Sequence, residues 1–540
     1  PCWRKACARF CPEPMTEQAR QYRDMAKTAS WTMVSRVLGL VRDQLTAGVF
    51  GASAVGAAFL FAFQIPNLFR RLLGEGALTA AIVPVLADKT ARDGQAAAFG
   101  FLNYALRRIL PGMIGLTLLG IGVALLWAFL SPADANVAIL TAACMPYMPL
   151  ICVAALFTSA VNLSGRFGLA EIASGLLNLC MIVGLGLFGL LADTEMGKAG
   201  WLCAGALAGG TLQLLIPLQG LRQAGWRPGP VHVDVAAWRT LSIAFLPAAL
   251  GAGIQQVNFL ISRGLAYKVS DAGLTYYYIA NRIVELPIGL FSASIAVVMF
   301  PALAMAFAQG DRAALGRNYA RGLRLILAVN VAAAFGLAVL AGPIVQLLFE
   351  FGKFTPEHCA ATGRLLVLFA FAMPFYAMIS LATRALNVAG QTRVTLIAAL
   401  HALVVNFVGS LAAVALGYGV EGLAVANAVS TVWQYLVLRH YLKRLAPEFL
   451  AEPMVKPALQ VLLGSFLLGI IAYQATAWIR LWGHDHLPEK LNLGLAMFVG
   501  GGLAMVAYAV YLDVLRYPER DLLRGFANKL LRRTGYQLKV

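Results

Sequence analysis

Residues 111–130, PGMIGLTLLGIGVALLWAFL, form a stretch of twenty residues without a charged side chain. A helix that crosses the hydrocarbon core of a bilayer needs about 20 mostly apolar residues. A second stretch of this kind, SGLLNLCMIVGLGLFGLLA, follows at residues 174–192. Segments of this length and composition predict a membrane protein with several spanning helices.

The composition of the whole chain supports the same interpretation. Hydrophobic residues make up 60% of the 540 residues and charged residues only 13%, with a mean hydropathy of +0.74. Soluble domains contain about 25% charged residues. Segments of alternating apolar and polar residues, which are typical of outer-membrane barrels, do not recur. We therefore expect an all-α polytopic membrane protein, because each spanning segment must satisfy its own backbone hydrogen bonds.

Apolar segments of sufficient length predict about fourteen spans by this rule. They lie at roughly 29–50, 54–73, 97–130, 136–163, 169–192, 199–221, 238–268, 272–307, 318–349, 360–389, 393–417, 421–442, 456–480 and 491–515.

Basic residues alternate between the two sides of these spans. The formal net charge is +18, and one side carries most of the arginines and lysines in the connections. The opposite side has little beyond Lys198, Lys268, Lys353 and Lys490. Under the positive-inside rule this asymmetry places both termini in the cytoplasm and requires an even number of spans. The positive charge is thus a topology signal, and we expect no nucleic-acid partner.

A shift of 217 positions aligns residues 58–87 with residues 275–304, with Pro84 over Pro301. Both segments pass from an aromatic cluster through a polar site to a Pro-x-Leu-Ala ending. The repeat predicts two pseudo-symmetric six-helix lobes, at 28–222 and 238–446, joined by a cytoplasmic linker at 223–237. Since each lobe has an even number of spans, their symmetry axis should follow the membrane normal, with a central cavity between the lobes.

The remaining segments lie outside the repeat. Residues 1–27 are interpreted as a cytoplasmic N-terminal leader, in which Cys2, Cys7 and Cys11 do not have zinc-site spacing. Residues 447–515 contain two further spans. Residues 516–540 form a basic amphipathic tail, which we expect to lie on anionic lipid at the cytoplasmic surface. No metal site is predicted, since His484, Asp485 and His486 are typical of a solvated turn.

Charged side chains lie within several predicted spans. The stretch SRVLGLVRDQLTAGVFG at 35–51 contains Arg36, Arg42 and Asp43. Each charge facing lipid at mid-membrane costs at least about 2.5–3.5 kcal/mol, so these side chains should face the protein interior. Asp43 neutralises one neighbouring arginine, which leaves the other in surplus.

Further polar groups occur at equivalent places in the second half of the chain. Arg282 has Glu285 one turn later, and Gln255 and Asn258 begin a polar stripe on the seventh predicted span. Together with Arg70 near the end of the second span, they predict a cationic cavity. Guanidinium groups bind phosphate oxygens bidentately and keep their charge. The expected ligand is pyrophosphate, bound by Arg36, Arg42, Arg70 and Arg282, with Asp43, Glu285, Gln255 and Asn258 in supporting positions.

The sequence gives little information on the energy source that the protein would use. Neither Gly-Lys pair has the surroundings of a phosphate-binding loop, so no nucleotide or other cofactor is expected. The driving force should come from the membrane potential, an ion gradient of Na⁺ or H⁺, or consumption of the product. Asn406, Ser410 and Asn427 are a candidate ion site, with hydrogen bonds between helices as the alternative role.

Four segments resemble a known family. They are SRVLGLVRD (35–43), PNLFRRLLGEGALTAAIVPVLA (66–87), NRIVELPIGLFSASIAVVMFPALA (281–304) and LFEFGKFT (348–355). They are similar to signature segments of MurJ (MviN-type) lipid II flippases of the multidrug/oligosaccharidyl-lipid/polysaccharide (MOP) exporter superfamily. The resemblance implies fourteen spans, two lobes around a cationic cavity, and a groove beside the last two spans for a polyprenyl tail. The family's cavity arginines correspond to Arg36, Arg42, Arg70 and Arg282, with Asp43 beside the second, and Arg166 also belongs to the set.

The resemblance implies transport of undecaprenyl-pyrophosphate-linked peptidoglycan precursor, lipid II, across the bacterial inner membrane by alternating access. The expected partners are this lipid, the surrounding membrane lipids and the cell-wall synthesis machinery. Three alternatives stay open. A flippase for another polyprenyl-linked oligosaccharide would keep the same site, a multidrug or organic-cation antiporter would need uncompensated carboxylates, and a membrane enzyme would need catalytic carboxylates or a metal in larger loops.

Overall fold

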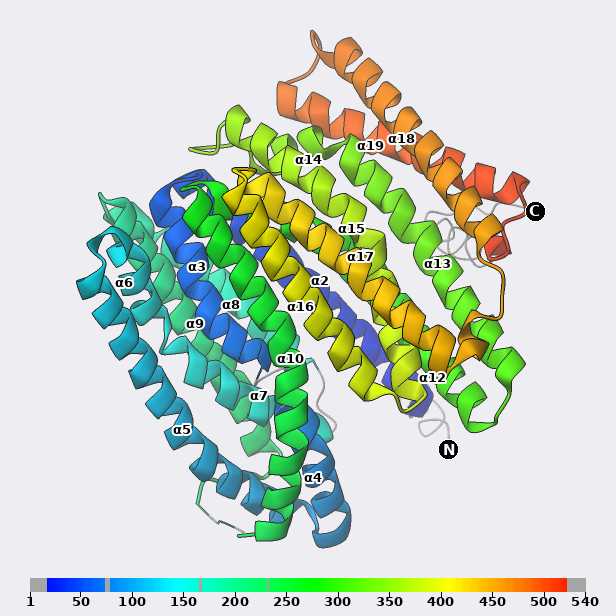
Figure 1. Ribbon diagram of the computed structural model, residues 1–540. Coiled ribbons are helices and arrows are strands. Elements are labelled where there is room, and N and C mark those ends of the chain that lie inside the picture. The colour runs from blue at the N-terminus through cyan, green and yellow to red at the C-terminus, as the bar shows by residue number, and fades with distance from the viewer. Residues whose placement is uncertain (1–16, 73–77, 165–167, 230, 232, 522–540) are drawn as a thin grey trace, which may run out of the picture. The chain divides into compact units, whose positions relative to one another are not determined.

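The computed structural model describes residues 17–72, 78–164, 168–229, 231 and 233–521, and these residues form helices and turns without a strand (Figure 1). Within these ranges, nine helical segments are long and apolar enough to cross a membrane. The predicted all-α membrane fold is therefore confirmed. The number of fourteen spans stays a prediction, because some predicted spans are helices that are short or contain several charges. Examples are α3 (Ala54–Phe69), with 16 residues, and α2 (Glu17–Phe50), which contains Arg36, Arg42 and Asp43.

The helices group into two compact units. Unit 1 contains residues up to Thr46 together with Ala58–Gln256, and unit 2 contains Ala47–Ala57 and the chain from Val257 onward. The boundaries between the units thus fall inside helices α2, α3 and α10 (Val235–Val269). The predicted lobes at 28–222 and 238–446, the linker at 223–237 and the pair of spans in 447–515 stay predictions.

Unit 1 is held together by closely packed helices. Besides its parts of α2, α3 and α10, it contains α4 (Leu78–Asp93), α5 (Gln95–Leu130), η2 (Pro132–Asp134), α6 (Ala135–Cys144), α7 (Tyr147–Leu163), α8 (Leu169–Gly186), η3 (Phe188–Leu191) and α9 (Glu195–Gln223). Helices α8 and α9 approach so closely that a Cβ at Gly205 would lie 2.6 Å from the carbonyl oxygen of Cys180. Small residues at such crossings allow dense van der Waals packing, which drives helix association in membranes.

Unit 2 has two apolar cores. It contains α11 (Gly273–Pro287), η4 (Ile288–Ser292), α12 (Ala293–Ala308), α13 (Arg312–Val339), α14 (Ala341–Phe349), α15 (Pro356–Val388), α16 (Thr392–Ala415), α17 (Gly419–Leu445), η5 (Pro447–Leu450), α18 (Val455–Gly483) and α19 (Glu489–Val514). Tyr319, Leu381 and Leu438 join α13, α15 and α17 in the larger core. The α18–α19 pair packs on α13 (Figure 1). There the Tyr508 hydroxyl donates to the carbonyl of Ala328 at 2.8 Å.

The two repeated segments share a local distortion. Helix α3 is followed by a π turn at residues 70–72, and α11 is followed by the π turn η4. With the shift of 217 positions, residues 70–72 correspond to 287–289. Proline removes a backbone donor, and Pro66 and Pro287 lie just before the two π turns, which fits a bend there. Further along the chain, the two repeated segments contain α4 and α12. The connection at 74–96, between the second and third predicted spans, therefore includes a helix.

The structure describes only the last part of the predicted leader. Helix α2 begins at Glu17, so residues 17–27 are helical and continuous with the first predicted span. Residues 1–16, with the three leader cysteines, lie outside the described residues, as does the amphipathic tail from 522 onward.

Candidate functional site

Arg42 is held by a hydrogen-bond network inside unit 1. Its guanidinium donates to Oδ1 of Asp43 from Nη2 at 2.6 Å and from Nε at 3.2 Å. A third bond runs from Nη1 to Oδ1 of Asn178 on α8, at 3.0 Å. The Asp43 side chain is 3% exposed and that of Arg42 13%. The acid therefore neutralises this arginine, and the amide fixes its orientation.

Asn178 is itself fixed by the backbone of two helices. Its amide nitrogen donates to the carbonyl of Ser35 on α2 at 3.2 Å and to that of Ser174 on α8 at 3.3 Å. The amide oxygen remains to accept from Arg42. Asn178 thus links α2 to α8 and has a defined amide orientation, a role that its place in an apolar run did not indicate.

Arg36 and Arg70 also belong to unit 1. Arg36 is half-buried on α2 and makes no ion pair with a described residue. Arg70 lies in the π turn after α3, where its Nε donates to Oδ1 of Asn67 at 2.6 Å. This amide partner is neutral. Arg36 therefore retains a charge suited to an anion, whereas Arg166 lies outside the described residues.

Arg282 lies in unit 2, on α11 and before the π turn η4, which begins at Ile288. Its Nη1 is 3.6 Å from Oε2 of Glu285, and the side-chain amide of Asn281 donates to Oε1 of the same carboxylate at 2.9 Å. The Arg282 and Glu285 side chains are 28% and 33% exposed. The pairing predicted from their i, i+3 spacing is thus present, but it is long and partly exposed. An anion can compete for such an arginine more easily than for Arg42.

A second arginine of unit 2 was not among the candidate site residues predicted from the sequence. Arg263 on α10 is 6% exposed, and its guanidinium carbon lies 5.4 Å from the ring centre of Tyr278 and 5.8 Å from that of Phe259. Aromatic faces attract a guanidinium, more strongly when water is excluded. Its position next to Ser262, in the polar stripe that begins with Gln255 and Asn258, is the sequence feature that could have identified it.

The tyrosine cluster of α11 has mixed roles. Tyr277 is buried and packs edge-on against Phe369, with ring centres 4.9 Å apart, while Tyr278 covers Arg263. Tyr276 lies against His358. Tyr277 therefore serves the packing of α11 on α15.

The candidate ion-site residues are engaged in hydrogen bonds between helices. Asn406 on α16 donates to Oδ1 of Asn258 at 2.7 Å and to the hydroxyl of Ser262 at 2.8 Å. The Ser410 hydroxyl donates to Oδ1 of Asn406 at 3.4 Å. These contacts join α10 to α16 and match the alternative role considered for the polar residues. Gln255, at the start of the stripe, is exposed and belongs to unit 1.

Asn427 on α17 lies in a different contact. Its Oδ1 accepts a 2.5 Å hydrogen bond from the hydroxyl of Tyr376 on α15. The Ser430 and Thr431 hydroxyls donate to its backbone carbonyl. A Na⁺ site at Asn427 would have to replace the Tyr376 bond.

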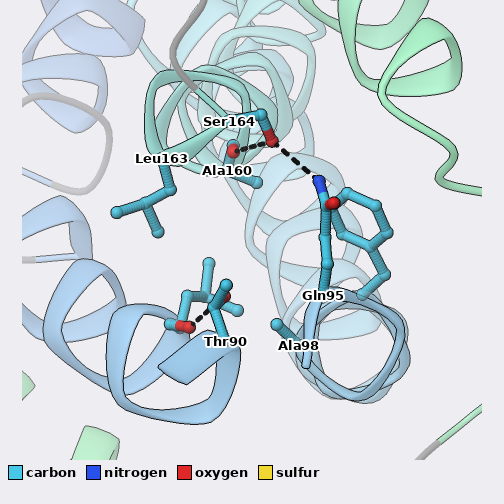
Figure 2. Close-up of a pocket in the computed structure, with 8 residues that line it drawn as sticks. Thr90, Gln95, Ala98, Ala160, Leu163 and Ser164 are labelled. Atoms are coloured by element: carbon cyan, nitrogen blue, oxygen red, sulfur yellow. Dashed lines mark hydrogen bonds between the residues drawn. The ribbon is translucent and has the colours of Figure 1, made fainter. Parts of the chain in front are cut away.

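Unit 1 also contains a small pocket of about 230 Å³ between α4, α5 and α7 (Figure 2). Gln95 donates to the Ser164 hydroxyl at 3.2 Å across it, and Thr90 bonds back to the carbonyl of Leu86. The residues that line it are neutral, so it lacks the positive charge that a pyrophosphate needs.

The segment before α10 is docked on unit 1. Trp226 donates to Oδ1 of Asn103 at 2.9 Å, and Nζ of Lys89 lies 2.7 Å from Oδ2 of Asp234. The hydrogen bond to Asp234 raises the pKa of Lys89. The backbone N–H of Ala237 and then Lys89 lower the pKa of Asp234. This part of the predicted linker is therefore anchored through both aromatic and ionic contacts.

The comparison with known families shows to which family the chain belongs. A family model described as lipid II flippase MurJ matches residues 46–491. The chain belongs to the MurJ family. The probable lipid II flippase MurJ of Vibrio cholerae is 30% identical over 522 residues, which cover 92% of this chain and 96% of the relative. That of Bdellovibrio bacteriovorus is 30% identical over 502 residues, covering 89% and 92%.

Solved structures agree with the MurJ fold. A lipid II flippase MurJ in an inward closed conformation superimposes with a TM-score of 0.74 at 21% identity, covering 92% of this chain and 99% of that one. An inward-facing multidrug-resistance MATE transporter of the MOP superfamily gives 0.65 at 12% identity, covering 79% and 99%. The predicted family is thus confirmed, the likeness to these structures supports the fold, and the ligand roles of the arginines stay predictions.

Proposed function

We propose that this MurJ-family chain is a flippase that moves lipid II from the inner to the outer leaflet of the bacterial inner membrane. The observation that carries the proposal is the similarity over nearly the whole chain to relatives named as probable lipid II flippases. The chain would translocate the lipid by alternating access without changing it covalently, and both termini would lie in the cytoplasm. Lipid II would be supplied by the cell-wall synthesis machinery on that side.

The arginines would bind the pyrophosphate of the substrate. Arg36 makes no ion pair with a described residue and the pair of Arg282 with Glu285 is long, which supports a direct role for both; Arg70, the third proposed ligand, donates to Asn67. Arg42 is already paired with Asp43, so its part in the site would be exerted through the Asn178 network. Since no covalent step is involved, the energy would come from the membrane potential, an ion gradient or removal of the product.

Growth rescue of a flippase-depleted bacterium tests the assignment. Arg36→Ala and Arg282→Ala should fail to rescue growth while the protein level stays normal. Arg312→Ala is the matched control, because that side chain is 81% exposed at the start of α13 and should rescue fully. Normal growth of both cavity variants would contradict the proposal.

Reconstituted vesicles test the substrate. Purified chain should move lipid II to the opposite leaflet, measured by its accessibility to an enzyme added outside, and the product should have an unchanged mass. The same vesicles loaded with another polyprenyl-pyrophosphate oligosaccharide measure selectivity. Faster movement of that lipid than of lipid II would assign the chain to the other glycan.

A further inference from the structure

An apolar groove of about 760 Å³ runs between α16 and α17 in unit 2. Its walls are exposed valine and leucine side chains, among them Val404, Leu416 and Val429. Its volume falls within the roughly 300–1,000 Å³ of small-molecule sites. Its lining residues come from α16, α17 and the turn between them, and not from the α18–α19 pair, beside which the family resemblance implies a groove for a polyprenyl tail.

Small residues create the floor of the groove. Gly409 and Gly422 face the partner helix, where added Cβ atoms would lie 3.2 Å from Cβ of Ala426 and 2.7 Å from Cβ of Ala413. Ala412 is exposed within the groove. The two helices therefore meet closely at their backbones while the flanking valines stand out on both sides. The result is a concave strip on an otherwise convex helical surface.

The groove has the length of one leaflet. Residues 404 to 416 of α16 rise by roughly 18 Å at 1.5 Å per residue. Half of a hydrocarbon core of about 30 Å is close to this length. Basic residues lie at the opposite ends of the helices, at Arg393, Lys443 and Arg444. By the positive-inside rule the turn at 416–418 faces the outer side, so the groove lies in the outer leaflet.

Both signs of charge lie near the outer end of the groove. Glu421 lines it, and its Oε1 is 3.4 Å from Nε of Arg364 on α15. Both side chains are substantially exposed, at 44% and 65%. Tyr418 is exposed beside them, as expected for a tyrosine at the membrane interface. This rim can meet an ammonium group at Glu421 and a phosphate at Arg364.

We propose that the α16–α17 groove binds one acyl chain of an outer-leaflet phosphatidylethanolamine, with its zwitterionic head group over Glu421 and Arg364. An acyl chain that lies in a groove contacts the protein on several sides, whereas an acyl chain beside a single helix contacts it on one side. The phosphate of phosphatidylglycerol would meet Arg364 in the same way, but that lipid lacks the ammonium partner for Glu421. This inference does not depend on which lipid-linked glycan the protein transports.

Photolabelling of the full-length chain in vesicles tests the acyl-chain site. The probe is phosphatidylethanolamine with a photoactivatable diazirine on one acyl chain, in a mixture of unlabelled phosphatidylethanolamine and phosphatidylglycerol. Adducts should concentrate on residues 404–429, about tenfold above the exposed face of α5, which corresponds to ~1.4 kcal/mol of preference. Even labelling of both surfaces would overturn the proposal.

A groove-filling variant separates a specific site from general lipid contact. Ala412→Phe places a ring in the groove and should reduce the labelling of 404–429 to the level of α5. Ala204→Phe is the matched control, because Ala204 is an exposed alanine of the α9 span in unit 1. It should leave the enrichment unchanged. Retained enrichment in Ala412→Phe, with α5 labelled normally, would overturn the proposal.

The head group is tested with the same probe on two lipids. The phosphatidylethanolamine probe should label the groove more strongly than a phosphatidylglycerol probe, and the double variant Glu421→Gln, Arg364→Gln should abolish that difference. Equal labelling of the unmodified protein by both probes would overturn the zwitterionic assignment. Displacement of the probe by added undecaprenyl phosphate, but not by phosphatidylethanolamine, would assign the groove to a polyprenyl chain instead.

Discussion

The backbone N–H of Lys353 donates a 2.8 Å hydrogen bond to the carbonyl oxygen of Gly48, joining two turns of unit 2 that are about 300 residues apart in the chain. Glycines make this approach feasible. Gly352 has a φ of +60°, and a Cβ there would collide with the carbonyl of Gly48. Gly51 has a φ of +61°, and a Cβ there would lie 2.6 Å from the carbonyl oxygen of Lys353.

Gly352→Ala should therefore destabilise the protein through two effects. The left-handed backbone costs an alanine about 1–2 kcal/mol. Forcing the two turns apart adds about 1–3 kcal/mol, as overpacking does elsewhere. Gly390→Ala is the matched control, since Gly390 has a φ of +73° with open space around it. Thermal unfolding should shift further for Gly352→Ala, and the Lys353 amide should exchange faster with deuterium. Equal shifts for the two variants would contradict a specific contact between the turns.

Asn178→Leu tests the network around Arg42. The variant keeps the branched shape of the side chain but removes the acceptor for Nη1 and the donor that ties α8 to the Ser35 carbonyl of α2. We expect a loss of about 1–2 kcal/mol in unfolding free energy and slower lipid transport, because a hydrogen bond to a charged group is lost. Thr211→Val on α9 is the control, since that exposed hydroxyl bonds only within its own helix. Transport at the unmodified rate in Asn178→Leu would show that the orientation of Arg42 is unimportant.

The Lys89–Asp234 pair predicts how pH affects the docking of the segment before α10. Asp234 has a lowered pKa, so its stabilising effect is present above its unfolded value of about 3.9 and is lost as the pH falls through the folded value. Lys89 has a raised pKa, so its effect is present below about 10.4 and is lost as the pH rises through the folded value. The contact should thus contribute fully between these limits.

Two variants test the acid limit and the alkaline limit of the Lys89–Asp234 contact separately. Asp234→Asn should remove the acid-dependent loss of docking, and Lys89→Met the alkaline loss, as measured by the pH dependence of hydrogen exchange at Ala237 after correction for the intrinsic rate. Arg92→Met on the same helix is the control, because its pair with Asp88 is largely exposed. A change in the pH profile with Arg92→Met but none with Lys89→Met would refute the assignment.

Glu519 anchors the segment after α19 to α13. Its Oε1 accepts from Nε and Nη2 of Arg324 at 3.0 and 2.9 Å, and Oε2 lies 3.4 Å from Nε of Arg321. The Glu519 side chain is 8% exposed. Glu519→Gln should cost about 2–3 kcal/mol, since loss of a buried partner leaves Arg324 uncompensated, although the 48% exposure of Arg321 limits the effect.

Glu448→Gln is the matched control for this pair. Glu448 is 3.5 Å from Arg312, whose side chain is 81% exposed, so the variant should cost less than about 1 kcal/mol. Unfolding in denaturant measures both. Similar losses for the two variants would mean that the anchor contributes no more than a surface ion pair.

Several properties of this protein follow from sequence alone. Long apolar runs such as 111–130 determine an all-α membrane protein, because a bilayer leaves backbone groups no partner outside the helix. The motifs around Arg42 and Arg282 were sufficient to indicate the MurJ family. The pairing of Arg282 with Glu285 was also predictable, since residues three apart on a helix are neighbours.

Only the tertiary structure decided the partners that lie far apart in the chain. Asn178 reaches Arg42 across 136 residues, Asn406 reaches Asn258 across 148, and Arg263 is buried between rings of two helices. Helical periodicity shows which face of a helix a side chain occupies, but not which helix packs against that face or at what height. Helix packing sets those contacts, and so it determines which charges are neutralised and which remain available.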